Sequence, residues 1–81
     1  MKQMIDLFLE FLTHEKKAST HTVSNYRRDL EQFEAFCQKN KLNLKRIDPT
    51  FLRSYLASLY EKRLKKSTIA RKLAVLRSFF R

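Results

Sequence analysis

Eighty-one residues suffice for one small domain, which buries roughly 60–65% of the surface that its unfolded chain exposes and has no room for a deep enzyme cleft. The composition, 43% hydrophobic and 32% charged, is typical of a folded domain rather than a disordered chain, and the absence of glycine and the single proline favour helices over hairpins. The net charge of +10 indicates a polyanionic partner, more often nucleic acid than an anionic membrane.

The sequence shows no pattern typical of a metal site, a cofactor site or a membrane segment. Cys37 is the single cysteine, which excludes a disulfide framework and a cysteine ligand cluster, and we expect it to lie in the core. The apolar run at residues 4–12 is interrupted by Asp6 and Glu10 and is far shorter than the roughly 20 residues that a bilayer span needs. We therefore expect no metal, no cofactor, no small-molecule substrate and no membrane contact, and by default a cytoplasmic location.

The first element is a helix expected at about residues 3–15. Its apolar residues leave only a narrow polar strip around Asp6 and Glu10, so its apolar surface is wider than an ordinary surface helix needs. We expect it to be the most buried helix of a small bundle. The alternative is that part of its surface, such as Leu7 or Phe11, contacts another domain or subunit.

A polar turn at residues 16–21 leads into a second helix. Ser19 is the best N-cap candidate, followed by Thr20, because a hydroxyl can accept from the free amides of the first turn. One face of the helix is apolar and is expected to face the core: Val23, Tyr26, Leu30, Phe33 and Cys37. We expect Asn40 to end this helix as a left-handed cap.

Ile47, Asp48 and Pro49 mark the start of a third helix. Asp48 is the expected N-cap, and Pro49 fits the first turn because its missing N–H would have no partner there. Ile47 can pack against Leu52 across the helix start. The side chains expected to face inward are Leu52, Tyr55, Leu56 and Leu59.

A fourth helix is expected from Ser67 onward. Its apolar stripe is Ile69, Leu73, Leu76 and Phe80, and the stripe on the opposite side is Ser67, Arg71, Ala74 and Ser78. Residues 62–81 include eight Lys or Arg and no Asp or Glu, so this helix combines a core side with a side suited to a polyanion. The sequence thus predicts an all-α domain of four helices. The sequence ends at Arg81 without a helix stop signal. We therefore expect this chain to be the N-terminal fragment of a longer protein.

The fourth helix and the turn before it resemble an earlier segment, at an offset of 46 positions as between Glu15 and Glu61. The identical pairs are Glu15 and Glu61, Lys16 and Lys62, Thr22 and Thr68, Leu30 and Leu76, and Phe33 and Phe79. Either the domain contains a structural repeat, or two amphipathic helices of the same period are similar by chance.

Catalysis finds little support. His14 and His21 are seven positions apart, and the polar residues 16–20 between them argue against a single helix that would place both on one face. Neither has a cysteine, histidine or carboxylate at metal-ligand spacing. No serine is paired in sequence with a base, and without glycine there is no phosphate-binding loop of the Walker or dinucleotide type. Tyr26 and Tyr55 lie on apolar stripes, so we expect them in or beside the core rather than acting as nucleophiles. We expect this chain not to be an enzyme.

Nucleic-acid binding is better supported, because basic and hydroxyl side chains gather at the starts of the second and fourth helices. Helix N-termini receive phosphate, and Arg and Asn side chains can also pair with base edges. The candidate DNA-binding residues are Thr20, His21, Thr22, Ser24, Asn25, Arg27, Arg28, Lys65, Lys66, Ser67, Thr68, Arg71, Lys72 and Arg77. We expect Asn25 and Arg71 to contact bases, and Lys65 and Lys66 to contact phosphates. The alternative is a basic face that is merely solvated.

Four segments in succession carry a resemblance to a known family: FLEFL, STHTVSNYRRDLEQF, IDPTFLRSYL and KKSTIARKLAVLRSFF. Over essentially its whole length the chain resembles the N-terminal core-binding domain of the tyrosine recombinases, the phage integrase and Xer-like family. The specific combination is Thr22, Tyr26, Arg27, Asp29, Leu30 and Phe33, followed by Ile69, Leu73, Leu76, Arg77 and Phe79.

The resemblance implies a compact SAM-like bundle whose second and fourth helices lie against a DNA duplex as half of a clamp. It implies that residues 1–81 form one core-binding domain and that the catalytic residues lie in a C-terminal domain outside this chain. The implied partners are double-stranded DNA at a recombination half-site, that catalytic domain and other recombinase protomers. Where the family often has glycine before the two DNA-facing helices, this sequence has Lys17 and Arg63, a departure that bears on the turns and not on the fold. A helical protein-interaction module and a stand-alone helix-turn-helix regulator stay open as alternatives.

Overall fold

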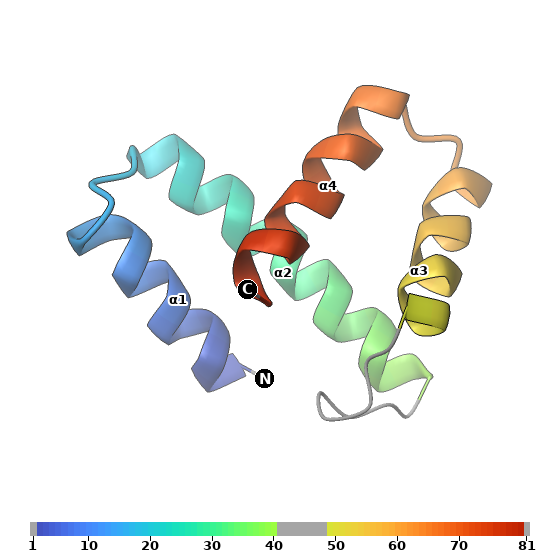
Figure 1. Ribbon diagram of the computed structural model, residues 1–81, viewed down its shortest axis with the longest axis horizontal. Helices are drawn as coiled ribbons and strands as arrows, with labels where there is room; N and C mark the ends of the chain where they lie inside the picture. Colours follow the sequence, from blue (N-terminus) through green and yellow to red (C-terminus); the bar gives the residue numbers. More distant parts are fainter. Residues whose placement is uncertain (1, 41–48, 81) are drawn as a thin grey trace.

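The protein folds into four helices, described here from a computed structural model that covers residues 2–40 and 49–80. They are α1 (Lys2–His14), α2 (Thr20–Lys39), α3 (Pro49–Glu61) and α4 (Lys66–Phe79), and the described residues include no strand. The helices α2 and α4 cross near the centre, with α1 beside α2 and α3 beside α4 (Figure 1). The all-α, four-helix prediction is confirmed. None of the helices in the described ranges is long and apolar enough to cross a membrane.

The start of α2 is fixed by a side-chain cap. The backbone of Ser19 is extended, with φ −67° and ψ 158°, and its Oγ accepts a hydrogen bond of 3.1 Å from the N–H of Thr22. This satisfies one of the amides that a helix start leaves free, as predicted. The cap position of α4, Lys65, has nearly the same backbone, φ −65° and ψ 149°, but its side chain makes no capping hydrogen bond.

The end of α2 differs from the prediction. Asn40 has φ −96°, so it is not a left-handed cap. Instead its Nδ2 donates to the carbonyl of Phe36 at 2.8 Å, and its own backbone N–H donates to the same carbonyl at 3.1 Å. Because these two donors already satisfy the carbonyl, the chain needs no left-handed residue there. The predictions for Ile47 and Asp48 lie outside the described residues.

The turns before α2 and α4 share one backbone conformation. Lys17 has φ 52° and Arg63 has φ 57°, the two positive values among the described residues, and these positions are related by the offset of 46. The capping positions Ser19 and Lys65 are related by the same offset. Both left-handed turns therefore form without glycine, and the match in backbone conformation supports a structural repeat over chance similarity.

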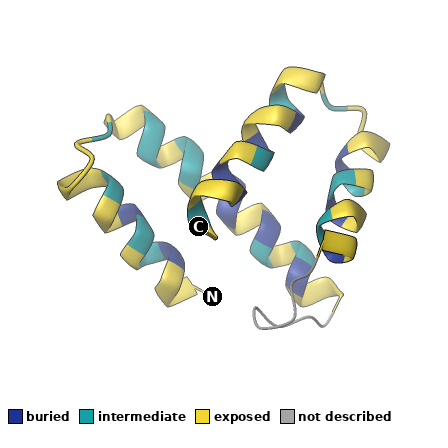
Figure 2. Ribbon diagram, viewed as in Figure 1, coloured by how far each residue is buried: buried dark blue, intermediate teal, exposed yellow. Residues whose placement is uncertain are grey.

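The core lies where the four helices face one another, and Figure 2 shows the buried residues along their inner sides. Its buried hydrophobic members are Ile5, Leu9, Leu30, Phe33, Cys37, Phe51, Tyr55, Leu59, Ile69, Val75 and Leu76. Phe33 is completely buried, and its ring lies 5.0 Å from that of Tyr55 and 5.7 Å from that of Phe80, both edge to face. The predicted core position of Cys37 is confirmed.

Two predictions about helix faces were wrong. Helix α1 is not the most buried helix: it buries Ile5 and Leu9, whereas α2 buries four residues, because α1 packs on one side only. In α4 the predicted stripe ended at Phe80, which is 39% exposed, while Val75 and Lys72 are buried instead. A charged residue thus occupies part of the core side of α4.

Candidate nucleic-acid interface

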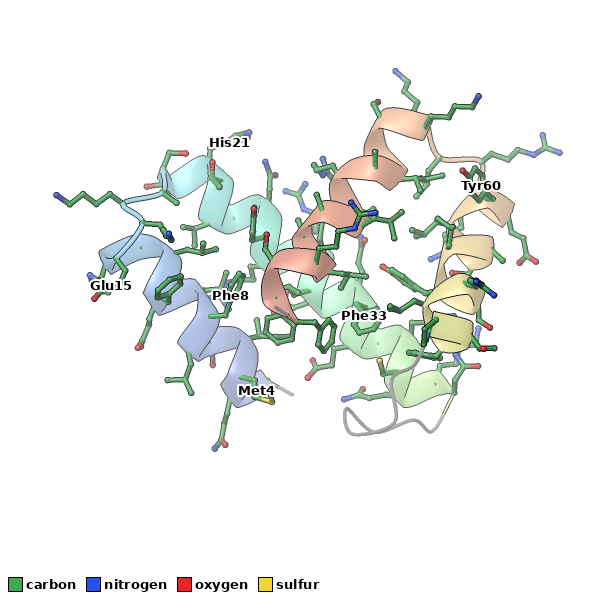
Figure 3. The ribbon with its side chains drawn as sticks, viewed as in Figure 1. Met4, Phe8, Glu15, His21, Phe33 and Tyr60 are labelled. Atoms are coloured by element: carbon green, nitrogen blue, oxygen red, sulfur yellow. The ribbon has the colours of Figure 1, made fainter. Side chains whose placement is uncertain are left out.

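The N-termini of α2 and α4 lie along the same edge of the molecule, the upper edge in Figure 1. His21, labelled in Figure 3, marks the α2 part of this edge, which we call the basic edge. We count as its members the exposed candidate residues at the starts and in the N-terminal halves of α2 and α4, except Arg27, which pairs with Asp6 of α1: Thr20, His21, Ser24, Arg28, Lys65, Lys66, Ser67 and Arg71. The domain measures 34 × 29 × 18 Å, so its longest dimension is similar to one turn of a DNA duplex, about 34 Å.

The electrostatics of the basic edge favour an anion. Neither α2 nor α4 has an acidic residue in its first turn, and α4 has none along its whole length. A helix N-terminus carries a partial positive charge and free amides, so an anion beside it is stabilised. The exposed carboxylates of α2, such as Glu31, lie farther along the helix.

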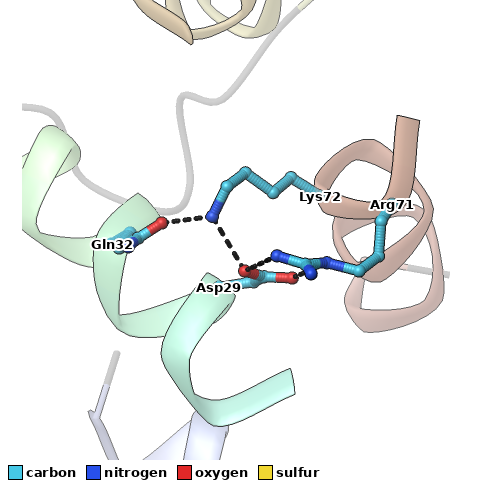
Figure 4. A network of polar contacts seen from close by, with 4 residues as sticks. All are labelled: Asp29, Gln32, Arg71 and Lys72. Atoms are coloured by element: carbon cyan, nitrogen blue, oxygen red, sulfur yellow. Dashed lines mark hydrogen bonds and ion pairs between the residues drawn. The ribbon is translucent and has the colours of Figure 1, made fainter. Parts of the chain in front are cut away.

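Arg71 lies on the surface, and the buried carboxylate of Asp29 binds the inner side of its guanidinium. Its Nε donates to Asp29 Oδ2 at 3.3 Å and its Nη2 donates to Asp29 Oδ1 at 3.2 Å (Figure 4). The side chain of Arg71 is 44% exposed, whereas that of Asp29 is 1% exposed. The pair therefore joins α4 to α2, with the carboxylate in the protein interior and the guanidinium at the surface.

Lys72 belongs to the same cluster but not to the surface. It is 5% exposed, its Nζ donates to Asp29 Oδ1 at 2.9 Å, and it also donates to Gln32 Oε1. A buried ammonium needs such partners, because desolvation of an unpaired charge is costly. The sequence-based assignment of Lys72 to the DNA side treated it as a solvated residue, and its interior position removes it from the basic edge.

The sequence does contain a signal for this cluster. Asp29 lies three residues after Tyr26 and four before Phe33, and Lys72 lies three after Ile69 and four before Leu76. Each charge therefore sits within an apolar helical stripe, one acidic and one basic. Opposite charges at such positions are compatible with a buried pair, but only the packing of the two helices shows that they meet.

The remaining candidate residues take different positions. Arg27 is directed to α1, where its Nη1 lies 3.4 Å from Asp6 Oδ1 in a pair that is about half exposed. Thr22, Asn25 and Thr68 are half-buried, and Thr22 Oγ1 accepts from Ser19 Oγ at 3.0 Å within the cap. Arg77 is exposed near the end of α4, away from the N-terminal turn. The structure thus brings most of the candidates to one edge and separates Arg27, Lys72 and Arg77 from it.

Comparison with known proteins places the chain in a family. Residues 5–81 match the model of the phage integrase N-terminal SAM-like domain. The chain belongs to this family. It is 41% identical over 80 residues to tyrosine recombinase XerC of Staphylococcus carnosus and 42% identical over 78 residues to XerC of Oceanobacillus iheyensis, covering 99% and 95% of this chain. XerC of Syntrophus aciditrophicus is 40% identical over 89 residues and covers 100% of the chain.

This SAM-like domain spans about a quarter of the curated relatives it matches, 27% of the S. carnosus protein and 26% of the O. iheyensis protein. No solved structure matches the chain. The family resemblance inferred from the sequence is confirmed, and so is the SAM-like fold class.

Burial disfavours the nucleophilic form of two side chains, Cys37 and Tyr55. Burial raises the pKa of the Cys37 thiol, and burial together with the charge of Asp29 raises the pKa of Tyr55 to about 12. Both shifts disfavour the anionic, nucleophilic form. Tyr26 is half-buried and its ring stacks on Phe8 at 6.1 Å, so the predicted core or core-rim positions of Tyr26 and Tyr55 are confirmed. Within the described residues there is no group of three His, Cys, Asp or Glu that could hold a metal ion.

Proposed function

We propose that this domain is the DNA-binding half-clamp of a tyrosine site-specific recombinase, with the basic edge lying against a recombination half-site. The observation that carries the proposal is that two helix N-termini, both free of acidic residues in their first turns, lie along one edge of the molecule with exposed Lys, Arg and hydroxyl side chains. The relatives' name, tyrosine recombinase, supports the same reading.

The individual roles follow from exposure and chemistry. Lys65 and Lys66 are exposed at the start of α4 and contact phosphates, which gives affinity without sequence information. Arg71 is exposed with a fixed guanidinium, and with Asn25 it is the candidate for base contact. Lys72 takes no part in this interface, because its ammonium is buried on Asp29.

The chemistry of strand exchange, in this proposal, belongs to a C-terminal catalytic domain of the full-length recombinase, and this domain binds without cutting. Other recombinase protomers on the same DNA are its further partners. The full-length protein then acts in DNA integration or recombination in the cytoplasm. Neutralising about six phosphates gives a slope of log affinity against log salt near −5.

An amide NMR titration of the labelled domain with a duplex of about 30 base pairs, at low and moderate salt, tests the proposal. We expect shifts concentrated in residues 19–28 and 65–77, fading as the salt concentration rises. A matched pair of variants tests the assignment of the phosphate contacts. Lys65→Ala combined with Lys66→Ala reduces the magnitude of the slope of log affinity against log salt by about two, whereas Lys2→Ala, at an exposed residue of α1, leaves this slope unchanged. Binding without salt dependence, or shifts confined to residues 4–12, contradicts the half-clamp.

One observation favours a second candidate function, a protein-interaction module. The outer face of α1 exposes Met4 by 50%, Leu7 by 67% and Phe11 by 44%. Exposed apolar side chains gathered on one helix face are typical of a contact surface. This alternative predicts self-association or partner binding that DNA does not change, which sedimentation equilibrium with and without duplex measures.

A further inference from the structure

We infer that Asp29 is a positioning residue for DNA binding: from the protein interior it fixes the guanidinium of Arg71 so that the outer edge of this group faces the duplex. The inference rests on the proposed DNA-binding function and deepens it. Figure 4 shows the arrangement, with the carboxylate of Asp29 between Lys72 and Arg71.

Two hydrogen bonds to one carboxylate fix the plane of the Arg71 guanidinium. An Arg side chain has five N–H donors in one plane. Two of them, on Nε and Nη2, donate to the two oxygens of Asp29 at 3.3 and 3.2 Å. The plane is therefore set by a two-point contact. Within residues 2–40 and 49–80 no other acceptor binds this guanidinium, so its remaining donors can bind a phosphate or a guanine, the groups that Arg binds in a bidentate manner.

Asp29, which binds this guanidinium, is itself held in the protein interior. The Asp29 side chain is 1% exposed, and its Oδ1 also accepts from Lys72 Nζ at 2.9 Å. Lys72 is itself held by Gln32 of α2. Because the carboxylate of Asp29 is enclosed where α2 packs against α4, Arg71 is bound to a fixed group of the core and not to a mobile side chain at the surface.

The cluster of Asp29, Arg71 and Lys72 carries a net positive charge. The cluster contains one carboxylate, on Asp29, and two cations, on Lys72 and Arg71. The buried Lys72 neutralises Asp29, so one positive charge of the cluster is left over, and the exposed member that carries it is Arg71. Asp29 can thus orient Arg71 without cancelling its attraction to DNA.

Fixing a long side chain before binding removes part of the entropy cost of binding. An Arg that is already ordered loses less rotamer freedom when it meets DNA, which corresponds to about threefold to tenfold in affinity. A simple electrostatic view gives the opposite sign, since removing a carboxylate from a DNA-binding face strengthens binding. The two views are therefore separable.

The test uses a variant that preserves net charge, Asp29→Asn with Lys72→Met. We expect it to bind a 30-base-pair duplex about threefold to tenfold more weakly at fixed salt, with the salt slope unchanged, because Arg71 keeps its charge but loses its two-point support. The matched control is Glu31→Gln with Lys39→Met, which makes the same charge change on exposed residues of α2 and is expected to stay within about twofold.

The same double change in an Arg71→Ala background separates positioning from a general structural effect. If Asp29 acts through Arg71, the change has no further effect there. An equal loss in both backgrounds, or an unchanged or higher affinity in the first, overturns the inference. If the unmodified domain shows no salt-sensitive duplex binding, the proposed function fails as well, and the two failures are thereby distinguished.

A measurement on the unmodified chain covers the case in which the variant does not fold. In the free domain we expect the Nε–H of Arg71 to show a side-chain NMR order parameter close to that of the backbone, about 0.8, and slow exchange with water. The exposed Arg28 and Arg77 are expected to be mobile and serve as internal references. An Arg71 side chain as mobile as these two overturns the inference without any substitution.

Discussion

At the scale of single residues, the buried phenol of Tyr55 makes the stability of the fold depend on pH. It is 3% exposed, and burial together with the nearby charge of Asp29 raises the pKa of its phenol from about 10 to about 12. Because the folded-state pKa lies above the unfolded value, the stabilisation is fully present below pH 10. It is lost as the pH rises from about 10 to about 12, where the unfolded chain ionises first.

We therefore expect the free energy of unfolding to fall by on the order of 2 kcal/mol between pH 10 and pH 12 through this one group. Urea denaturation across this pH range measures the change. Lysines also titrate in this range, so the comparison is with Tyr55→Phe, which retains the ring and removes the ionisable hydroxyl. A Tyr55→Phe variant with the same steep loss as the unmodified chain shows that Tyr55 is not the cause.

The buried charges show where the sequence was insufficient at this scale. Periodicity assigned the core residues Leu30, Phe33 and Cys37 correctly, since apolar side chains on one helix face are buried together. It did not predict the burial of Lys72, because a charge is buried only where another helix supplies its partner. That partner, Asp29, lies 43 positions away, so the pair depends on how α2 and α4 cross.

At the scale of the elements, the two left-handed turns before α2 and α4 are strained because neither contains glycine. Lys17 and Arg63 have φ values of 52° and 57°, a conformation in which the side-chain Cβ crowds the backbone. Glycine lacks this crowding, although it makes the unfolded chain more flexible. We expect Lys17→Gly and Arg63→Gly each to raise the free energy of unfolding by about 0.5–1 kcal/mol.

Thermal denaturation at constant ionic strength measures this gain, which amounts to an increase in Tm of roughly 2–8 °C for a domain of this size. The matched control is Lys62→Gly, beside Arg63 in the same turn, where φ is not positive and the added flexibility is expected to lower stability. The prediction is wrong if Lys62→Gly and Arg63→Gly destabilise the domain equally.

The helix boundaries were predictable because their signals are local. Ser19 was identified as the cap of α2 from its own hydroxyl and the residues that follow, and the structure has the hydrogen bond. The start of α4 was placed at about Ser67 and lies at Lys66, where no side-chain cap marks it. Asn40 was assigned a left-handed conformation that this residue often adopts, but its side chain satisfies the Phe36 carbonyl in another way.

At the scale of the whole molecule, the one-sided packing of α1 decides which of its apolar residues stabilise the fold. The inner face carries Ile5 and Leu9, and Phe8 meets Phe79 of α4 edge to face at 5.4 Å. The outer face carries Leu7, which is 67% exposed. The width of the apolar surface suggested burial of the whole helix, while the alternative from the sequence, exposure of Leu7 or Phe11, agrees with the structure.

The exposure difference predicts two distinct outcomes for substitutions on the same helix. Leu9→Ala removes buried methyl groups and leaves a cavity, so we expect it to lower the free energy of unfolding by about 2–4 kcal/mol. Leu7→Gln exposes no new core surface, so we expect it to change the free energy of unfolding by less than about 0.5 kcal/mol. Urea denaturation of the two variants and the unmodified chain measures both values.

The same pair of variants bears on the second candidate function. If the outer face of α1 binds a second copy of the chain, Leu7→Gln lowers self-association in sedimentation equilibrium. Duplex affinity is expected to stay unchanged, because α1 runs away from the start of α2 and Leu7 lies in the middle of α1 (Figure 1). A large loss of stability from Leu7→Gln contradicts the one-sided packing of α1. A loss of duplex affinity without unfolding places DNA on the α1 side and contradicts the interface proposed for α2 and α4.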